Sequence, residues 1–294
     1  MRPRRRLTQT PIRPCASCVN CCRAKRACSP QQGSDRMGTI NIGISGVAGW
    51  KVLQRTEARQ IEAVAKDPVV VRSTAYFKDN IAKTAKAEEL VKDYRLLNTA
   101  LSAFGLEGDI ANKAFIQKVL ESDTSDSSSL VNRLADKRYL KLAQAFGFGN
   151  ETPAADLGET VSQAYIQREF ERRVGESDEN MRLALNARRE LEAMQKRSSS
   201  DKTLWYEIIG NEPLRAVFEG AFGFGDSYSN LSIDRQLEEF MKASTRILGS
   251  SSFKDITAAD TTDKLVINFM ARSQLTESVA QNRYSAALTL LTGV

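Results

Sequence analysis

From Trp50 to Leu291, apolar residues recur at steps of three to five positions. This is the spacing of one face of an α-helix, and it differs from the strict alternation of a half-buried strand. Runs of β-branched residues occur only at Val69–Val71 and Val266–Ile267. The chain is therefore expected to be all-α, an irregular multi-helix bundle without a sheet.

The same spacing gives expected helix bounds. Helices are predicted over 50–65, 76–85, 90–104, 115–120, 130–146, 201–209, 213–223, 233–248, 261–275 and 278–291. The charged segment 157–197 is rich in helix-forming residues, and Gly175 with Ser177 should divide it into two helices. Serine-rich stretches at 122–129, 198–200 and 250–252 are expected to be flexible loops. The break at 198–200 suggests two helical lobes, 37–197 and 198–294.

A short motif occurs three times, as Ala103-Phe-Gly-Leu106, Ala145-Phe-Gly-Phe148 and Ala221-Phe-Gly-Phe224. Each copy closes a predicted helix, where glycine adopts the left-handed conformation and the next apolar residue packs back in a Schellman arrangement. An Asp or Asn that could cap the next helix follows each copy, namely Asp109, Asn150 and Asp226. A phosphate-binding loop is the other interpretation, but the motif follows helices and no Lys-Ser/Thr comes after it. The motif therefore predicts repeated helix-glycine-helix hairpins.

Residues 1–36 differ in composition from the rest. They hold nine Lys/Arg against Asp35 alone, whereas residues 37–294 hold 33 basic and 35 acidic groups, so the basic character belongs to this segment. It is rich in Pro and Arg and is expected to be disordered. The interpretation we favour is that Met37 is the natural start and that 1–36 is an upstream read-through.

All the cysteines lie in that segment, at Cys15, Cys18, Cys21, Cys22 and Cys28. Cys18, Cys21 and Cys28, with basic residues between them, resemble the first half of a two-zinc, six-cysteine DNA-binding cluster. The second half is absent, and an iron–sulfur run through Cys15 lacks its fourth cysteine, because position 25 is Lys. A metal-binding tail stays open as an alternative.

The chain contains no histidine, which excludes Ser-His-Asp and Cys-His catalysis and histidine-ligated zinc. Acidic residues gather at Glu176-Ser-Asp-Glu179 and at Asp255, Asp260 and Asp263, but helix N-caps explain them better than a metal site. We therefore predict no catalytic residue, no bound metal or cofactor and no small-molecule substrate.

Other charged and aromatic residues are also given structural roles. Arg172-Arg173 and Arg188-Arg189 lie among glutamates and are expected to form solvated pairs on a charged helix face, so no nucleic-acid partner is predicted. Trp50 and Trp205 are expected to pack in the core or between lobes. No apolar run approaches the ~20 residues of a membrane span, and no cleavable secretory signal is present.

Three segments carry a family resemblance: Gly46-Val-Ala-Gly-Trp50-Lys-Val-Leu-Gln-Arg-Thr56, Asn132–Gly149, and Glu176–Leu191 with Met181-Arg-Leu-Ala-Leu-Asn186. Over about residues 40–294 the chain resembles domain-of-unknown-function family 1217. The resemblance implies an α-helical bacterial protein without an assigned activity, of a kind often encoded among flagellar genes. It transfers no catalytic residue.

The C-terminal segment suggests a contact surface, because Leu275, Val279, Leu288 and Leu291 are expected to share one helical face. Terminal helices with an apolar stripe can interlock with partners, and docking on the chain's own core is the alternative. The sequence thus favours a non-enzymatic, flagellum-associated protein that binds other proteins, cytoplasmic or at the flagellum. A cytoplasmic helical adaptor or regulator unrelated to flagella is the second hypothesis.

Overall fold

The computed structural model describes residues 40, 42–150 and 156–292, except for the side chains of 226–227 and 277–292. Contacts within the chain separate the residues up to Met37 from the unit Gly38–Val294, and every described residue belongs to the second unit. The tail 1–36, with its cysteines and its expected disorder, therefore lies outside the described residues.

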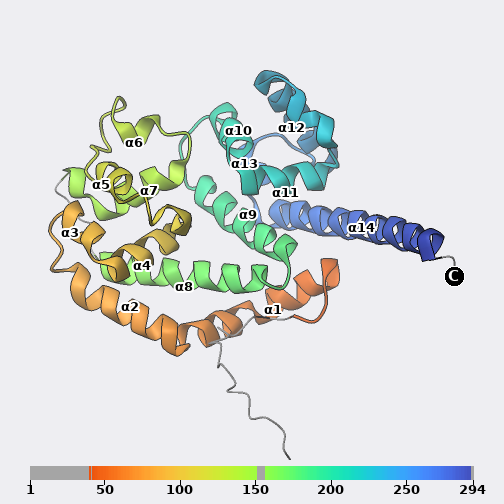
Figure 1. Ribbon diagram of the computed structural model, residues 1–294. Helices are drawn as coiled ribbons and strands as arrows, with labels where there is room; N and C mark the ends of the chain where they lie inside the picture. The colour runs from red at the N-terminus through yellow and green to blue at the C-terminus, as the bar shows by residue number, and fades with distance from the viewer. Residues whose placement is uncertain (1–39, 41, 151–155, 293–294) are drawn as a thin grey trace, which may run out of the picture. The chain divides into compact units, whose positions relative to one another are not determined.

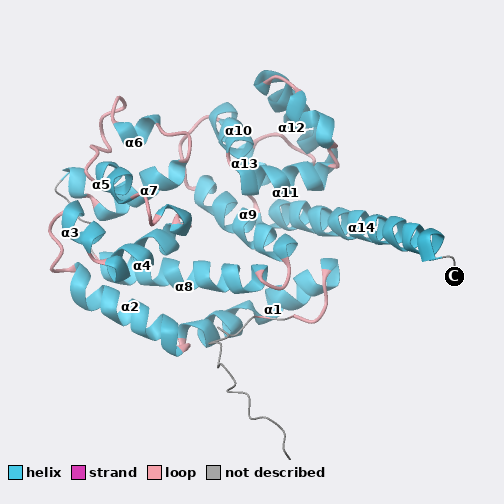
Figure 2. Cartoon of the chain, in the orientation of Figure 1, coloured by secondary structure: helices cyan, strands magenta, loops and turns pink. Residues whose placement is uncertain are grey.

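The described residues contain fourteen α-helices and three 3-10 helices, and no strand occurs among them (Figures 1 and 2). The α-helices are α1 (Gly46–Ala65), α2 (Pro68–Ile81), α3 (Ala87–Lys92), α4 (Tyr94–Phe104), α5 (Lys113–Leu120), α6 (Leu130–Arg133), α7 (Lys137–Phe146), α8 (Leu157–Gly175), α9 (Glu179–Gln195), α10 (Asp201–Gly210), α11 (Glu212–Phe222), α12 (Ile233–Leu248), α13 (Phe253–Ile256) and α14 (Ala259–Thr292). The 3-10 helices are η1 (Glu107–Asp109), η2 (Phe148–Asn150) and η3 (Asp226–Asn230). The all-α prediction is confirmed, and so is the division of 157–197 into two helices.

Two predicted helices are each broken by an aspartate. The segment 90–104 divides into α3 and α4 at Asp93, whose carboxylate accepts hydrogen bonds from the backbone N–H groups of Arg95 (2.8 Å) and Leu96 (3.1 Å). The segment 130–146 divides into α6 and α7, and Asp136 accepts from the N–H of Arg138 (2.9 Å). A side chain that caps a new helix competes with continuation of the preceding helix. The predictions of one continuous helix over 90–104 and over 130–146 are therefore wrong.

At the C-terminal end the prediction divides a helix that is continuous in the structure. The two helices predicted over 261–275 and 278–291 are one continuous helix, α14. Thr276, at the expected break, donates its hydroxyl to the carbonyl of Arg272 (3.0 Å), a bond that a helix accommodates. The β-branched runs Val69–Val71 and Val266–Ile267 likewise lie in helices, in α2 and α14.

The three glycines of the repeated motif adopt the predicted left-handed backbone, with φ of 71° at Gly105, 62° at Gly147 and 74° at Gly223. Gly105 and Gly223 close Schellman motifs, because the N–H of Leu106 bonds the carbonyl of Leu101 (2.8 Å) and that of Phe224 bonds Glu219 (3.0 Å). Gly147 differs from the prediction. Its N–H makes a single bond to the carbonyl of Ala143 (2.9 Å), which is the simpler αL motif.

The predicted caps after these glycines are wrong for two copies. Asp109 accepts a hydrogen bond from the hydroxyl of Tyr139 (2.6 Å), and α5 begins after Asn112. Asn150 accepts from the backbone N–H of Thr124 (3.1 Å). Tertiary partners thus take the side chains that local sequence assigned to caps. The side chain of the third candidate, Asp226, lies outside the described residues.

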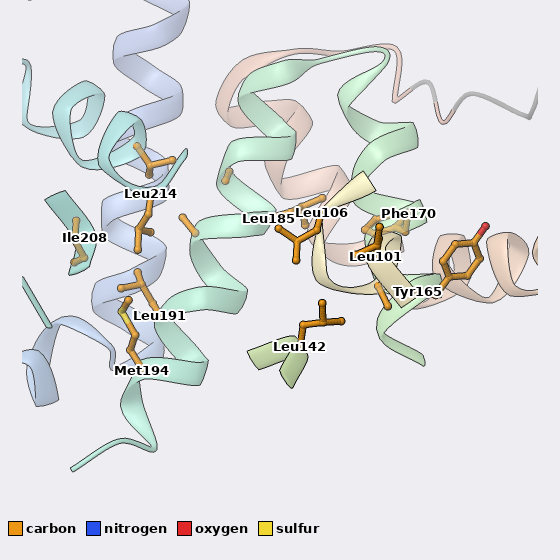
Figure 3. Close-up of a cluster of buried hydrophobic side chains, with 14 of the residues drawn as sticks. Leu101, Leu106, Leu142, Tyr165, Phe170, Leu185, Leu191, Met194, Ile208 and Leu214 are labelled. Atoms are coloured by element: carbon orange, nitrogen blue, oxygen red, sulfur yellow. The ribbon is translucent and has the colours of Figure 1, made fainter. Parts of the chain in front are cut away.

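Helix α9 packs on α1 and α8, which precede it, and on α11 and α14, which follow it. Figure 3 shows Leu185 of α9 directed toward Leu101, Leu106 and Leu142, while Leu191 and Met194 of the same helix face Ile208 and Leu214. Helix α14 also packs on α1 and α9 as well as on α11. The predicted lobe boundary at 198 falls in the loop between α9 and α10, and the division into two lobes there stays a prediction.

Both tryptophans are fully buried, as predicted. The Nε1 of Trp205 donates to the carbonyl of Ser251 (3.0 Å), and its ring meets Phe218, Phe240 and Phe253 edge to face. The serine-rich loop 122–129 is held to the body, because the amide of Asn132 donates to the carbonyls of residues 124 and 126.

Candidate functional site

The strongest concentration of charge in the interior lies where α7, α8 and α9 meet. We call it the central charge cluster, and it consists of Lys141, Arg168, Glu171, Asn186, Arg189 and Glu190. Its two carboxylate residues are nearly inaccessible, with 3% of Glu171 and 5% of Glu190 exposed. Ionised groups at such depth need partners, because transfer of an unpaired charge from water to the interior is costly.

Each buried carboxylate meets at least two cations. Arg189 binds Glu171 through Nε (2.8 Å) and Glu190 through Nη1 (2.7 Å), so one guanidinium joins α8 to its own helix α9. Lys141 of α7 binds Glu190 at 2.7 Å. Arg168 lies 3.5 Å from Glu171 and 3.8 Å from Glu190. The cluster therefore ties three helices together by charge.

These contacts fix the protonation state of Glu190. Burial acts to raise its pKa, but the charges of Arg189 and Lys141 and their hydrogen bonds outweigh burial and hold the pKa at about 2. Burial, followed by repulsion from Arg189, lowers the pKa of Arg168. An ionised carboxylate saturated by cations stabilises the fold and has no proton to give at neutral pH.

Two arginines also reach the end of α4. Arg168 donates to the carbonyl of Phe104 (3.5 Å), and Arg138 donates to the carbonyl of Gly105. The last carbonyls of a helix lack intrahelical partners and carry partial negative charge, which cations stabilise. A Cβ added at Gly105 would lie 3.2 Å from Cζ of Arg168, so the glycine also makes room for the guanidinium.

A second group of charges joins α8 to the start of α2. Arg173 is 3% exposed and binds Glu169 (2.7 Å) and Asp67 (3.1 Å). Asp67 is also the N-cap of α2, since it accepts from the N–H of Val69 (2.8 Å). One carboxylate thus starts α2 and anchors it to α8.

The predicted solvated pairs at Arg172-Arg173 and Arg188-Arg189 are therefore largely wrong. Arg173 and Arg189 bind carboxylates of other helices in the interior, and Arg188 binds Glu57 of α1. Arg172, which binds Glu169 and Glu176, and Arg173, which also binds Glu169, keep i,i+3 and i,i+4 contacts within α8, and Arg173 in addition binds Asp67 outside that helix. The error arises because α8 and α9 are packed by other helices on several sides, so their charged faces turn inward.

The acidic groups considered as metal ligands separate in the structure. Asp178 caps α9 by accepting from the N–H of Met181 (3.1 Å), as expected. Asp255 accepts from the hydroxyl of Ser250 (2.7 Å), and Asp263 binds Lys51 of α1 (2.8 Å). Among the side chains that the structure describes, no three His, Cys, Asp or Glu residues are placed to hold a metal ion.

Helix α14 begins inside the body and ends outside it (Figure 1). In its first half Leu265, Val266, Phe269 and Met270 are buried, and Phe269 packs where α11 has Gly220, whose added Cβ would lie 2.7 Å from the ring. Leu275, five residues after Met270, is 65% exposed. Figure 1 shows the remaining turns extending past the other helices.

Because α14 is one continuous helix, the prediction that Leu275, Val279, Leu288 and Leu291 share one face is wrong. The side chains of the last three lie outside the described residues. In one helix with 3.6 residues per turn, positions 288 and 291 fall about 160° to 220° around the axis from position 275. The four positions therefore do not form one stripe.

The geometry defines an all-helical protein with paired charges inside α8 and α9 and a long terminal helix. The chain belongs to the family described as "Protein of unknown function (DUF1217)", whose model matches residues 103–279. This confirms the resemblance on the two later segments, Asn132–Gly149 and Glu176–Leu191, and the match does not reach the first, Gly46–Thr56.

Among solved structures, the chain is similar to the crystal structure of protein AGR_C_984 from Agrobacterium tumefaciens, determined by a structural genomics consortium. The two share 24% sequence identity and a TM-score of 0.67, over 81% of this chain and 99% of that chain. The likeness shows the fold alone. No protein of curated function matches the chain. In the described part of the chain, every helix is too short or too polar to cross a lipid bilayer.

Proposed function

We propose that this protein is not an enzyme and that it acts by binding other proteins in the assembly or structure of the bacterial flagellum. The observation that carries the proposal is α14, a helix of 34 residues whose first half is packed on α1, α9 and α11 and whose second half leaves them (Figure 1). A helix that is anchored in a core and extends past it can enter a groove of a partner.

The interior charges support binding rather than catalysis. The carboxylates of the central charge cluster are buried, ionised and shared among Lys141, Arg168 and Arg189, so their role is to position α7, α8 and α9. A rigid scaffold of this kind suits a component that presents a contact surface. The flagellar context rests on the family resemblance, whose members are often encoded among flagellar genes. The protein would act in the cytoplasm or at the flagellum itself.

The test is an in-frame deletion of residues 37–294 in the native host, scored for swimming and for basal-body structure. Three copies are then supplied: the full chain, a copy starting at Met37, and a copy starting at Met37 and ending at Gln274. The last keeps the packed half of α14 and removes the turns that extend past the other helices. Circular dichroism and immunoblotting establish that it folds and accumulates.

We expect the deletion to abolish swimming with incomplete basal bodies, the two longer copies to restore both, and the copy ending at Gln274 to restore neither. Normal swimming after the deletion would contradict the flagellar role and favour the adaptor hypothesis. Full rescue by the copy ending at Gln274 would show that the part of α14 beyond Gln274 is not the contact surface.

A further inference from the structure

Helix α14 meets two glycines just before it leaves the body. Arg272 of α14 covers Gly223 at the end of α11, where an added Cβ would lie 2.2 Å from Nη1 of the guanidinium. Gln274 covers Gly46 at the start of α1, where an added Cβ would lie 2.4 Å from Oε1 of the amide. Real Cβ atoms essentially never come within 3.0 Å of another heavy atom, so neither side chain could stay in place over any other residue.

The backbone at both positions also requires glycine. The φ angle is 69° at Gly46 and 74° at Gly223, in the left-handed region that residues with a Cβ rarely adopt. The end of α11 and the start of α1 therefore each present a surface without a side chain, against which a long side chain of α14 packs.

The two contacts hold α14 from opposite sides. Successive residues of an α-helix are about 100° apart around the axis, so Arg272 and Gln274 point in directions about 200° apart. Both lie further along α14 than the buried Phe269, and Leu275, the next residue, is 65% exposed. Beyond this point the helix extends past the others (Figure 1). We call the four residues of these contacts, Gly46, Gly223, Arg272 and Gln274, the exit collar.

The end of α4 shows the same kind of contact inside the body. Gly105 has a φ of 71°, and Arg168 of α8 covers it while donating to the carbonyl of Phe104 (3.5 Å). In that place the guanidinium joins α8 to the end of α4. The parallel indicates that an arginine over a left-handed glycine positions one helix on the end of another.

We infer that the exit collar fixes the direction in which α14 leaves the body, and that Arg272 and Gln274 are positioning residues for this helix. Contacts on two opposite sides leave the helix one direction, whereas loss of the collar lets the part beyond Gln274 swing about the packed half. A contact helix held in one direction loses less conformational entropy on binding than one that swings. The bearing of the collar on partner binding rests on the proposed function.

The experiment measures the distance between two spin labels by double electron–electron resonance. It uses the full chain with its five cysteines, all in the tail, replaced by serine. One label is attached through Ala58→Cys on the exposed face of α1, and the other through Ser285→Cys, beyond the collar. A reference pair, Ala58→Cys with Lys264→Cys, reports on the packed half of α14.

Two variants remove the collar in different ways. Arg272→Ala with Gln274→Ala removes both long side chains, which are exposed and leave no buried gap. Gly223→Ala displaces the guanidinium from the other partner. Gly105→Ala is the matched control, because it places the same methyl group at nearly the same φ beneath another arginine, Arg168, but acts on α8.

We expect one narrow distance distribution between positions 58 and 285 when the collar is intact, and about twofold broadening in both collar variants. Gly105→Ala should leave this width unchanged, and no variant should change the distance between positions 58 and 264. A broad distribution with the collar intact, or an unchanged width in Arg272→Ala with Gln274→Ala, would overturn the inference. So would equal broadening by Gly105→Ala and Gly223→Ala, or an equal change in both label pairs.

The collar and the proposed function fail separately. The label distances are measured without a partner, so normal swimming after deletion of 37–294 would leave the collar standing. An immobile deletion strain combined with unchanged label distances would leave the proposed function standing and refute the collar.

Discussion

Replacing Glu190 by glutamine tests whether the central charge cluster holds the fold together. Glutamine keeps the shape of the side chain and removes its charge. The change breaks ion pairs with Lys141 and Arg189, both at 2.7 Å, and weakens the attraction of Arg168 at 3.8 Å. Arg189 keeps its contact with Glu171, and Lys141 is 44% exposed, so neither cation is left buried and alone.

The magnitude follows from the pKa of Glu190. Its folded-state value of about 2 lies below the ordinary value of 4.5. At about 1.4 kcal/mol per pKa unit, this difference corresponds to a contribution on the order of 3 kcal/mol to the free energy of unfolding. A depressed carboxylate pKa stabilises the folded state above the unfolded-state value. The contribution is therefore complete above about pH 5 and is lost as the pH falls from 4.5 toward 2.

The assay is urea unfolding of wild type and variant, followed by far-ultraviolet circular dichroism at a series of pH values from about 7 to about 2.5. At neutral pH the variant should be less stable by about 2 to 3 kcal/mol, and the difference should shrink steadily below about pH 4.5. Glu192→Gln is the matched control on the same helix. Its side chain is 68% exposed and 3.5 Å from Lys196, and its loss should stay within about 0.5 kcal/mol.

Two results would refute this reasoning. One is a loss below about 1 kcal/mol at neutral pH, which would mean that solvent replaces the ion pairs without cost. The other is a stability difference that does not change with pH. It would mean that the substitution of Glu190 by glutamine destabilises the protein through packing and not through the lost charge.

Three further substitutions test local features, each by urea unfolding. Gly147→Val should cost about 1 kcal/mol or more because φ is 62°, while Gly108→Val, with open space around the added Cβ, is the control; equal losses would contradict the αL end of α7. Asp93→Ala should cost about 1 to 2 kcal/mol through the lost α4 cap and the lost hydroxyl bond of Tyr76 (2.6 Å), and an unchanged midpoint would count against this cap. Gly220→Val should cost about 2 kcal/mol and expose α14 to proteases, since the new Cβ would lie 2.7 Å from Phe269; unaltered cleavage would rule out this packing.

The helical architecture could be predicted because the signal for it is local and redundant. The bounds predicted for α12, 233–248, coincide with those of the structure, since a strongly periodic segment there ends at Gly249 in the left-handed conformation. The three glycine motifs succeeded for the same reason, because positive φ at a helix end depends on the residue itself and its neighbours. The helix breaks at Asp93 and Asp136 were not predicted, because an aspartate inside an apolar pattern can either face solvent or start a new helix.

The charge cluster could not be predicted in the same way. Arg188 and Arg189 are adjacent in sequence, yet one binds Glu57 of α1 and the other binds Glu171 of α8. The i,i+4 rule assigns partners within one helix and so gives the solvated interpretation by default. What decides between the two outcomes is how many helices surround α8 and α9, and this depends on the topology of the whole chain. The feature that could have raised the question is the low apolar content of α8 and α9, which is too small for helices packed on several sides unless their charges are paired inside.

The charged interior and the extended terminal helix are connected through α9. Ion pairs between α7, α8 and α9 depend on distance and orientation more strongly than apolar contacts do. They therefore fix the positions of these helices, and a small displacement of one helix breaks them. Helix α14 packs on α9, whose position those ion pairs determine, and its direction beyond Gln274 is then set by the same framework. Loosening the cluster should therefore disturb the projection of α14 before it unfolds the body. Glu190→Gln is expected to impair rescue of swimming at temperatures where circular dichroism still shows a folded protein. Full rescue up to the melting temperature would show that the central charge cluster does not determine the direction of α14.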